Sequence, residues 1–237
     1  MADFDLLSSI SHELRTPLST LNASIELLMQ EADTLTPDDL RQLLRPTQVS
    51  LLSLQTMVNN LLESSRIEAG GRVLHRQSIH LGQVAAEAGR IVWPLLQRRR
   101  QQVCLELPLD VPPVNGDAAQ LLQVMVNLLT NAAKYSPEGA AIDIAVQVET
   151  AGVVVTVADR GPGIPAAMRA SLFDRFARLD DAGGDQHGIG LGLYVSRATI
   201  VAHGGTIGQA ARPGGGAIFW FRLPLPPADR PGAEQPA

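Results

Sequence analysis

The sequence predicts two parts: a helical hairpin over residues 1–70, then an α+β sandwich over residues 71–225 with helices on one face of a sheet. Three observations predict this division. Leucines recur every seven residues before residue 70, Gly70-Gly71 interrupts the helical pattern, and strand-like alternation of apolar residues occurs only after it. Residues 226–237 are rich in Pro, Ala and Gly, which predicts a disordered tail.

The composition excludes several classes of protein. The chain has 237 residues, 45% of them hydrophobic, which is enough to form a hydrophobic core without disulfide bonds or a structural metal. The single cysteine, Cys104, excludes a disulfide framework and a Cys-rich zinc site. The net charge of −5 provides no basic field for nucleic acid or an anionic membrane, and no apolar run approaches the roughly 20 residues of a membrane span. We therefore expect a cytoplasmic location, with any membrane anchor of the full-length protein lying upstream.

The hairpin is predicted from two apolar stripes. The first helix carries Leu7, Leu14, Leu21 and Leu28. The second begins at the N-cap Thr36 and ends at Gly70-Gly71, with a kink or restart expected at Pro46. Because two helices cannot bury both stripes, we expect a homodimer in which two hairpins form a four-helix bundle. The alternative is a hairpin that docks on its own downstream domain.

The second part mixes short strands with helices. The predicted elements are strands over 77–81 and 102–107, a helix over 81–100 interrupted by Pro94, a helix from the capping-box residue Asp117 to about 134, a hairpin over 142–157, a helix over 191–203 and a last hairpin to 223.

His12 lies on the outside of the predicted bundle. With Leu7, Leu14 and Leu21 at heptad position a, His12 falls at position f, farthest from the seam. Neutral imidazole is a competent nucleophile, and the adjacent Glu13 can orient the ring or take its proton. Thr16 follows one turn later on the same helix.

A polar stripe marks the helix that follows Asp117. Asn127, Asn131 and Lys134 are spaced four and three residues apart, opposite a leucine-rich face. This stripe is either a solvated face or a site in which amide oxygens bind a hard cation beside a phosphate-binding ammonium. Lys134 is the only lysine of the chain, against 18 arginines, which favours the second interpretation.

Two glycine-rich segments complete the candidate site. Asp159-Arg-Gly-Pro-Gly163 follows an apolar strand, and Gly188-Ile-Gly-Leu-Gly192 opens a helix, where backbone N–H groups can approach phosphate. Neither segment is a Rossmann fingerprint, because no βαβ unit surrounds it, nor a P-loop, because no Lys-Ser/Thr pair follows.

The order of these segments along the chain matches that of a known nucleotide-binding fold. Gln123–Gly139 resembles the N box, Asp159–Gly163 the first glycine box, Leu172–Phe176 the F box and Gly188–Leu193 the second glycine box of the Bergerat ATP-binding fold. That fold is shared by histidine kinases, type II topoisomerases, and chaperone and mismatch-repair ATPases. Ser9–Leu18 resembles the phosphoacceptor box of sensor histidine kinases. Residues 3–225 thus resemble a HisKA-type sensor histidine kinase of a two-component system.

The resemblance implies a function for each part of the chain. Residues 1–70 would form the dimerisation and phosphotransfer domain, and residues 71–225 the catalytic domain that binds ATP and Mg²⁺. His12 would take the γ-phosphoryl group with Glu13 as base, and Thr16 would assist dephosphorylation of a partner. The partner would be the receiver domain of a response regulator. We also expect an upstream sensor that this chain does not contain.

The resemblance also assigns nucleotide contacts. Asn131, supported by Asn127, would bind magnesium, Lys134 would contact phosphate, and Tyr135 would lie against the nucleotide. Asp159 would accept a hydrogen bond from the adenine amino group, with Gly161 and Gly163 shaping that wall. The remaining expected contacts, to the phosphates and to the lid that covers them, are Arg175 or Arg178, Gly188, Gly190, Gly192 and Leu193.

Asn127 separates the candidate functions. Relatives that hydrolyse ATP with water carry a glutamate base at this position, and an amide cannot act as that base. We therefore expect slow ATP hydrolysis and phosphoryl transfer to His12. The alternatives are an ATP-driven clamp and a non-catalytic dimeric scaffold or phosphotransfer protein.

Overall fold

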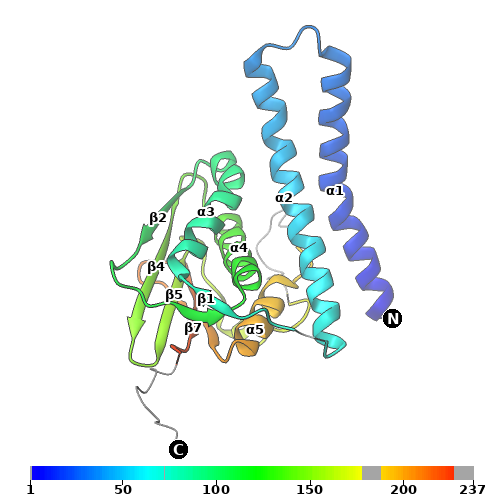
Figure 1. The fold of residues 1–237 in the computed structure, drawn as a ribbon. Helices are drawn as coiled ribbons and strands as arrows, with labels where there is room; N and C mark the ends of the chain where they lie inside the picture. The colour runs from blue at the N-terminus through cyan, green and yellow to red at the C-terminus, as the bar shows by residue number, and fades with distance from the viewer. Residues whose placement is uncertain (1, 72, 178–187, 227–237) are drawn as a thin grey trace, which may run out of the picture.

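The computed structural model describes residues 2–71, 73–177 and 188–226. Its first two helices, α1 (Ala2–Glu31) and α2 (Pro37–Glu68), form an antiparallel hairpin, as the two leucine stripes predict (Figure 1). A capping box starts α2: the Asp39 N–H donates to Thr36 Oγ1, and Thr36 donates from its backbone N–H to Asp39 Oδ2. The hydrogen bonds from the Thr36 hydroxyl and N–H hold the pKa of Asp39 below its ordinary value.

The prolines do not divide the helices. Pro46 lies inside an unbroken α2, so the helix does not restart there, and the kink expected at this residue stays a prediction. Pro94 lies inside an unbroken α3 (Leu81–Arg98), so the interruption expected there is wrong. Each proline removes one N–H donor, while the apolar side chains on both sides of it remain on one packed face. Tertiary packing of that face outweighs the lost hydrogen bond.

A five-stranded sheet forms the second part, in the order β2-β4-β5-β7-β6. Its strands are β2 (Gln102–Glu106), β4 (Ala141–Glu149), β5 (Gly152–Ala158), β6 (Thr206–Ala211) and β7 (Ala217–Leu223). β2 runs parallel to β4, and the other neighbours are antiparallel. Helices α3, α4 (Ala118–Tyr135) and α5 (Gly192–Ala202) cover one face of this sheet, and α2 packs against the helices (Figure 1).

The core lies between the sheet and its helices. The alternation predicted for β4 is found: Ile142, Ile144 and Val146 are buried, and their neighbours along the strand are more exposed. β7 alternates in the same way, with Phe221 fully buried. Burial of these side chains against α3 and α4 is the main force that holds the domain together. No helix of the described residues covers the opposite face of the sheet.

A short linker ties the hairpin to the start of α4. After α2, strands β1 (Gln77–Ile79) and β3 (Val114–Gly116) pair antiparallel. A separate 3₁₀ turn, η1 (Ala166–Met168), lies between β5 and α5 in the chain. Asp117 caps α4 through Oδ1 and accepts the His75 N–H on Oδ2 at 3.0 Å. The Asp117 N–H donates to Nε2 of the buried His203, so that ring is neutral and donates from Nδ1 to the Thr199 carbonyl.

No helix in the three described stretches of the chain has both the length and the apolar character needed to cross a lipid bilayer.

Candidate functional site

A cavity of about 550 Å³ lies between the helical hairpin and the sheet domain. Its wall includes Asn60 of α2 beside residues of α4, the end of β5 and the segment before α5. It gathers most of the residues selected from the sequence: Glu13, Thr16, Asn127, Asn131, Lys134, Tyr135, Asp159, Gly163, Gly188, Gly190, Gly192 and Leu193. Its volume falls in the usual range for small-molecule sites.

Asp159 lies at the end of β5, and one of its two carboxylate oxygens accepts backbone hydrogen bonds. Oδ1 accepts the Gly161 N–H at 2.9 Å and the Ala217 N–H at 3.0 Å. Oδ2 has no hydrogen-bond partner among the described residues, although Asp159 is only 4% exposed and lines the cavity. A buried, oriented carboxylate oxygen of this kind can accept one hydrogen bond from a ligand. Gly161 allows the close turn, because a Cβ there would lie 2.7 Å from the Tyr135 carbonyl oxygen.

The polar stripe of α4 divides into two parts. Asn131 and Lys134 are partly exposed and line the cavity, and the Asn131 amide has no hydrogen-bond partner among the described residues. The Lys134 ammonium lies 5.0 Å from the centre of the Tyr135 ring, and it is also the nearest atom to a Cβ built on Gly188. An amide oxygen and an ammonium therefore face the same space, and this pair suits a phosphate–cation ligand.

Asn127 is engaged by the helical hairpin instead. It is 2% exposed, and its amide exchanges two hydrogen bonds of 3.1 Å with the amide of Asn60. Its Oδ1 also accepts from Gln123, and its Nδ2 donates to the Gly192 carbonyl and lies 3.4 Å from Ser196 Oγ. In this arrangement the Asn127 oxygen already accepts two hydrogen bonds, which leaves Asn131 as the cation-binding candidate of the stripe.

The second glycine segment places backbone beside the cavity. Gly190 has φ +74°, and a Cβ there would lie 2.6 Å from the Ala177 carbonyl oxygen. The Phe176 N–H donates to the Gly190 carbonyl at 3.0 Å, which joins this segment to the Leu172–Phe176 turn. Helix α5 begins directly after, at Gly192, so its N-terminal N–H groups lie at the cavity wall.

The residues of α1 separate around the cavity. His12 is exposed, as its heptad position predicts, and it is not among the residues that line the cavity. Glu13 is 5% exposed, lines the cavity, and has no hydrogen-bond or ion-pair partner among the described residues. Thr16, one turn on, also lines it. The hairpin thus presents the Glu13 carboxylate and the Thr16 hydroxyl to the cavity, whereas the imidazole of His12, the residue before Glu13, lies outside it.

The arginine expected to contact phosphate has another partner here. Arg175 forms an ion pair with Glu68 at the end of α2 and lies over the Phe176 ring at 4.5 Å. Arg178 lies outside the described residues.

Several contact residues were not selected from the sequence. Asn60 lies in a helical stripe of leucines, and only its position among apolar neighbours distinguishes it from a solvated residue. Ser196 hydrogen-bonds the Gly192 carbonyl at 2.7 Å, which local sequence does not reveal because serines often return a bond to the preceding turn. Asp143 and Arg212 are joined by a hydrogen bond of 3.0 Å across 69 residues, for which the sequence carries no signal.

Two protein families match this chain in two separate segments. The His Kinase A (phospho-acceptor) domain matches residues 4–70, which carry His12. The histidine kinase-, DNA gyrase B- and HSP90-like ATPase family matches residues 116–227, which carry most of the cavity wall.

Individual relatives agree with these matches. The sensor protein KdpD of Escherichia coli is 36% identical over 97% of this chain and 25% of its own length. The structure of full-length ShkA in complex with AMPPNP is 27% identical, with a TM-score of 0.64 over 93% of this chain and 45% of that one. The complex of histidine kinase ThkA with the response regulator protein TrrA is 25% identical, with a TM-score of 0.63 over 95% of this chain and 63% of that one. This chain therefore spans only part of each relative.

Proposed function

Since this chain belongs to the sensor histidine kinases of two-component systems, we propose that it phosphorylates His12 from ATP and passes the phosphoryl group to an aspartate of a response regulator. The observation that carries this proposal is the shared cavity. One wall comes from the ATPase-like domain, and the other includes Glu13 and Thr16, the neighbours of His12 on α1. A phosphate donor in the cavity would thus lie beside the helix that bears the acceptor.

The chemistry of the transfer follows from the residues present. A neutral imidazole nitrogen of His12 attacks the γ-phosphorus, the bond from that phosphorus to the β,γ-bridging oxygen breaks, and ADP leaves with the bond electrons. The imidazole then loses a proton, for which the carboxylate of Glu13, its neighbour in the sequence, would be the base. Its burial without a hydrogen-bond partner among the described residues supports this role.

The positions of these residues in the cavity support the proposed nucleotide contacts. Asp159 Oδ2 would accept the adenine amino hydrogen, and Tyr135 would lie against the nucleotide. Lys134 and the backbone of the Gly188–Leu193 segment would bind phosphate oxygens. That ATP is the nucleotide is supported by the ATPase family match and by the AMPPNP complex of the ShkA relative.

The donor set in the cavity fits Mg²⁺. No cluster of three His, Cys, Asp or Glu side chains suited to a metal occurs among the described residues. The Asn131 amide, which faces the cavity without a hydrogen-bond partner there, matches the usual mode of one or two protein oxygens plus nucleotide phosphates. When bound, the ion would neutralise charge on the phosphates.

We propose two partners for the hairpin. Leu18 and Ile25 of α1, and Leu44, Leu51 and Val58 of α2, recur at heptad spacing and remain 45–49% exposed in a single chain. A second copy of the hairpin would bury this stripe and form the expected four-helix bundle. The complex of ThkA with a response regulator supports a receiver domain as the phosphoryl acceptor. Thr16 would help water attack the phosphorylated aspartate of that partner, which releases inorganic phosphate.

Comparing phosphoenzyme with released phosphate tests the proposed function. A kinase without a water-activating glutamate should accumulate protein-bound phosphate while releasing much less than one phosphate per chain over the same interval. Fast, continuous phosphate release without phosphoenzyme would indicate the ATP-driven clamp. Absence of ATP binding would indicate the non-catalytic scaffold. The measurement combines γ-labelled ATP with a coupled phosphate assay on the whole chain.

Replacing Asn60 by alanine should speed autophosphorylation about threefold to tenfold. The Asn60–Asn127 bonds hold the two domains in an arrangement in which His12 lies outside the cavity and Asn127 cannot turn to other ligands. Two hydrogen bonds are worth about 2 kcal/mol together, which sets an upper limit on the shift toward a rearranged state and is enough for a change in rate of about threefold to tenfold.

Gln55→Ala is the matched control for this variant, because Gln55 is an exposed residue of α2 outside the cavity. Single-turnover rates of label incorporation should rise for Asn60→Ala only. An unchanged or slower rate in a folded Asn60→Ala variant would contradict a restraining role for this contact.

A further inference from the structure

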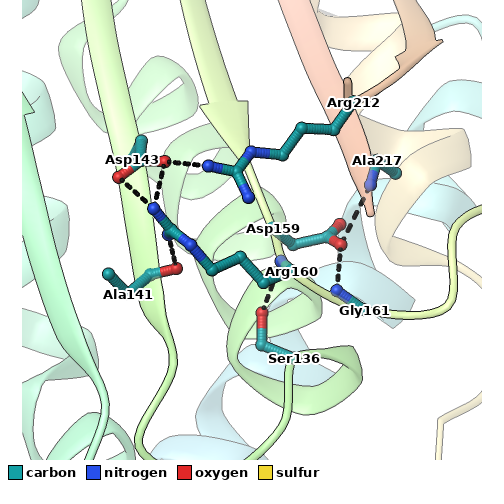
Figure 2. A network of polar contacts seen from close by, with 8 residues as sticks. All are labelled: Ser136, Ala141, Asp143, Asp159, Arg160, Gly161, Arg212 and Ala217. Atoms are coloured by element: carbon teal, nitrogen blue, oxygen red, sulfur yellow. Dashed lines mark hydrogen bonds and ion pairs between the residues drawn. The ribbon is translucent and has the colours of Figure 1, made fainter. Parts of the chain in front are cut away.

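Two arginines from different segments converge on one carboxylate at the helix-free face of the sheet (Figure 2). Asp143 of β4 lies next to Ile142 and Ile144, which point into the core, so its side chain points the other way. Arg160 Nη2 lies 3.0 Å from Asp143 Oδ2, and Arg212 Nη2 lies 3.0 Å from the same oxygen. None of these three residues lines the cavity.

The first arginine fixes the loop that follows Asp159. Arg160 directly follows Asp159 in the sequence. The Arg160 N–H donates to Ser136 Oγ at 3.1 Å, at the end of α4. Its guanidinium reaches the Ala141 carbonyl and Asp143, both on β4. The peptide between residues 159 and 160 is therefore anchored on one side by α4 and on the other by β4.

The second arginine fixes the hairpin that faces this loop. Arg212 follows β6, and its backbone exchanges hydrogen bonds within the β6–β7 turn: its N–H donates to the Gly216 carbonyl, and its carbonyl accepts the Gly215 N–H. This turn delivers the Ala217 N–H to Asp159 Oδ1. The approach is close, since a Cβ on Gly216 would lie 2.2 Å from the Asp159 carbonyl oxygen.

Asp159 thus receives its two N–H donors from two segments that share one anchor. The Gly161 N–H comes from the loop tied by Arg160, and the Ala217 N–H comes from the turn tied by Arg212 (Figure 2). Both donors bind Oδ1, which leaves Oδ2 without a hydrogen-bond partner among the described residues at the cavity wall. Asp143 joins the two segments because its carboxylate pairs with both guanidinium groups, and such charge-assisted bonds are more directional than neutral ones.

We propose that Asp143 is a positioning residue for recognition of the purine base, acting through Arg160 and Arg212 on the orientation of the Asp159 carboxylate. The proposal rests on the proposed function, in which Asp159 accepts the adenine amino hydrogen. It extends the base-recognition site to an ion-pair network on the other face of the sheet. A positioning role would distinguish this network from an ordinary surface ion pair, which contributes little to the free energy of folding.

Purine discrimination provides the test. Asp143→Asn keeps the shape of the side chain and removes the charge that holds both arginines. Dissociation constants for ATP and for inosine triphosphate, which carries a carbonyl in place of the amino group, are measured by calorimetry on the whole chain. ATP binding should weaken about tenfold, whereas inosine triphosphate binding should change less than about twofold, because only ATP uses the positioned oxygen.

Glu149→Gln is the matched control. Glu149 lies on the same strand and pairs with Arg222 of β7 at 2.6 Å, so its loss removes a similar ion pair far along β4 from Asp159. This variant should bind both nucleotides as the parent does. Equal weakening of both nucleotides by Asp143→Asn would assign the network to folding alone and overturn the proposal, as would unchanged binding of both.

A parallel Asp159→Asn variant separates the two levels of the proposal. If it loses ATP affinity while Asp143→Asn does not, base recognition by Asp159 stands and the positioning role of Asp143 is overturned. If Asp159→Asn itself leaves the preference for ATP intact, the assignment of Asp159 as the adenine acceptor fails, and the role of Asp143 fails with it.

Discussion

Replacing His12 by glutamine should abolish incorporation of label from γ-labelled ATP, a loss of at least about 10³-fold, while leaving ATP affinity unchanged. Glutamine keeps a polar side chain of similar length on the exposed face of α1 but has no nucleophilic nitrogen. Because His12 does not line the cavity, its replacement removes no contact to the nucleotide. Loss of labelling with full binding is therefore expected of an acceptor residue.

Ser11→Ala is the control, since Ser11 is the preceding exposed residue of the same helix. Labelling is followed by filter binding, and ATP affinity by calorimetry. Residual labelling of His12→Gln at more than a few per cent of the parent rate would place the acceptor elsewhere. A parallel loss of ATP binding would mean that the substitution had damaged the site.

Asp159→Asn should weaken ATP binding by about 100-fold, the second large effect expected. Two backbone N–H groups donate to Oδ1, so an asparagine at this position must place its amide oxygen there. Its amide nitrogen then takes the place of Oδ2 and turns a donor toward the adenine amino group. Two donors facing each other leave both unsatisfied, and a buried site designed for one hydrogen-bond pattern rejects the wrong one strongly.

The same reasoning predicts a change of preference. The carbonyl oxygen of inosine triphosphate can accept a hydrogen bond from the new amide, so that nucleotide should bind the variant at least as well as the parent. Titrations of both nucleotides, with unfolding temperatures as a check on folding, provide the measurement. Equal loss for both nucleotides would argue against a base-reading role for Asp159.

The fold could be predicted where a regular pattern is long. The leucine repeat predicted the first helix of the hairpin, and a second apolar stripe between Thr36 and Gly70 predicted the other. The alternation around Ile144 predicted β4 as a strand with one buried face. The prolines misled because the local cost of Pro46 and Pro94 is small beside the packing of the helix around them. The strand β3 was not predicted, since its place in the structure depends on antiparallel pairing with β1, which lies far earlier in the chain and leaves no local signal.

The candidate site, like the fold, could be predicted from the sequence only in part. Asn131, Lys134, Asp159 and the second glycine segment were selected from local motifs, and the structure brings them to one cavity. The pairing of Asn127 with Asn60 was not foreseeable, because it joins two domains across 67 residues. Motifs record which groups a site needs, whereas the long-range contacts that orient those groups depend on the tertiary fold.

Locating the transferred phosphoryl group tests the central claim most directly. The whole chain is incubated with ATP and magnesium, digested at neutral pH, and sequenced by tandem mass spectrometry under conditions that preserve phosphoramidates. The expected result is one phosphoryl group on His12, lost on brief acid treatment and stable to alkali. Phosphate on His75 or His80, on a hydroxyl residue, or on no residue despite bound ATP would contradict the assignment of His12 as the acceptor.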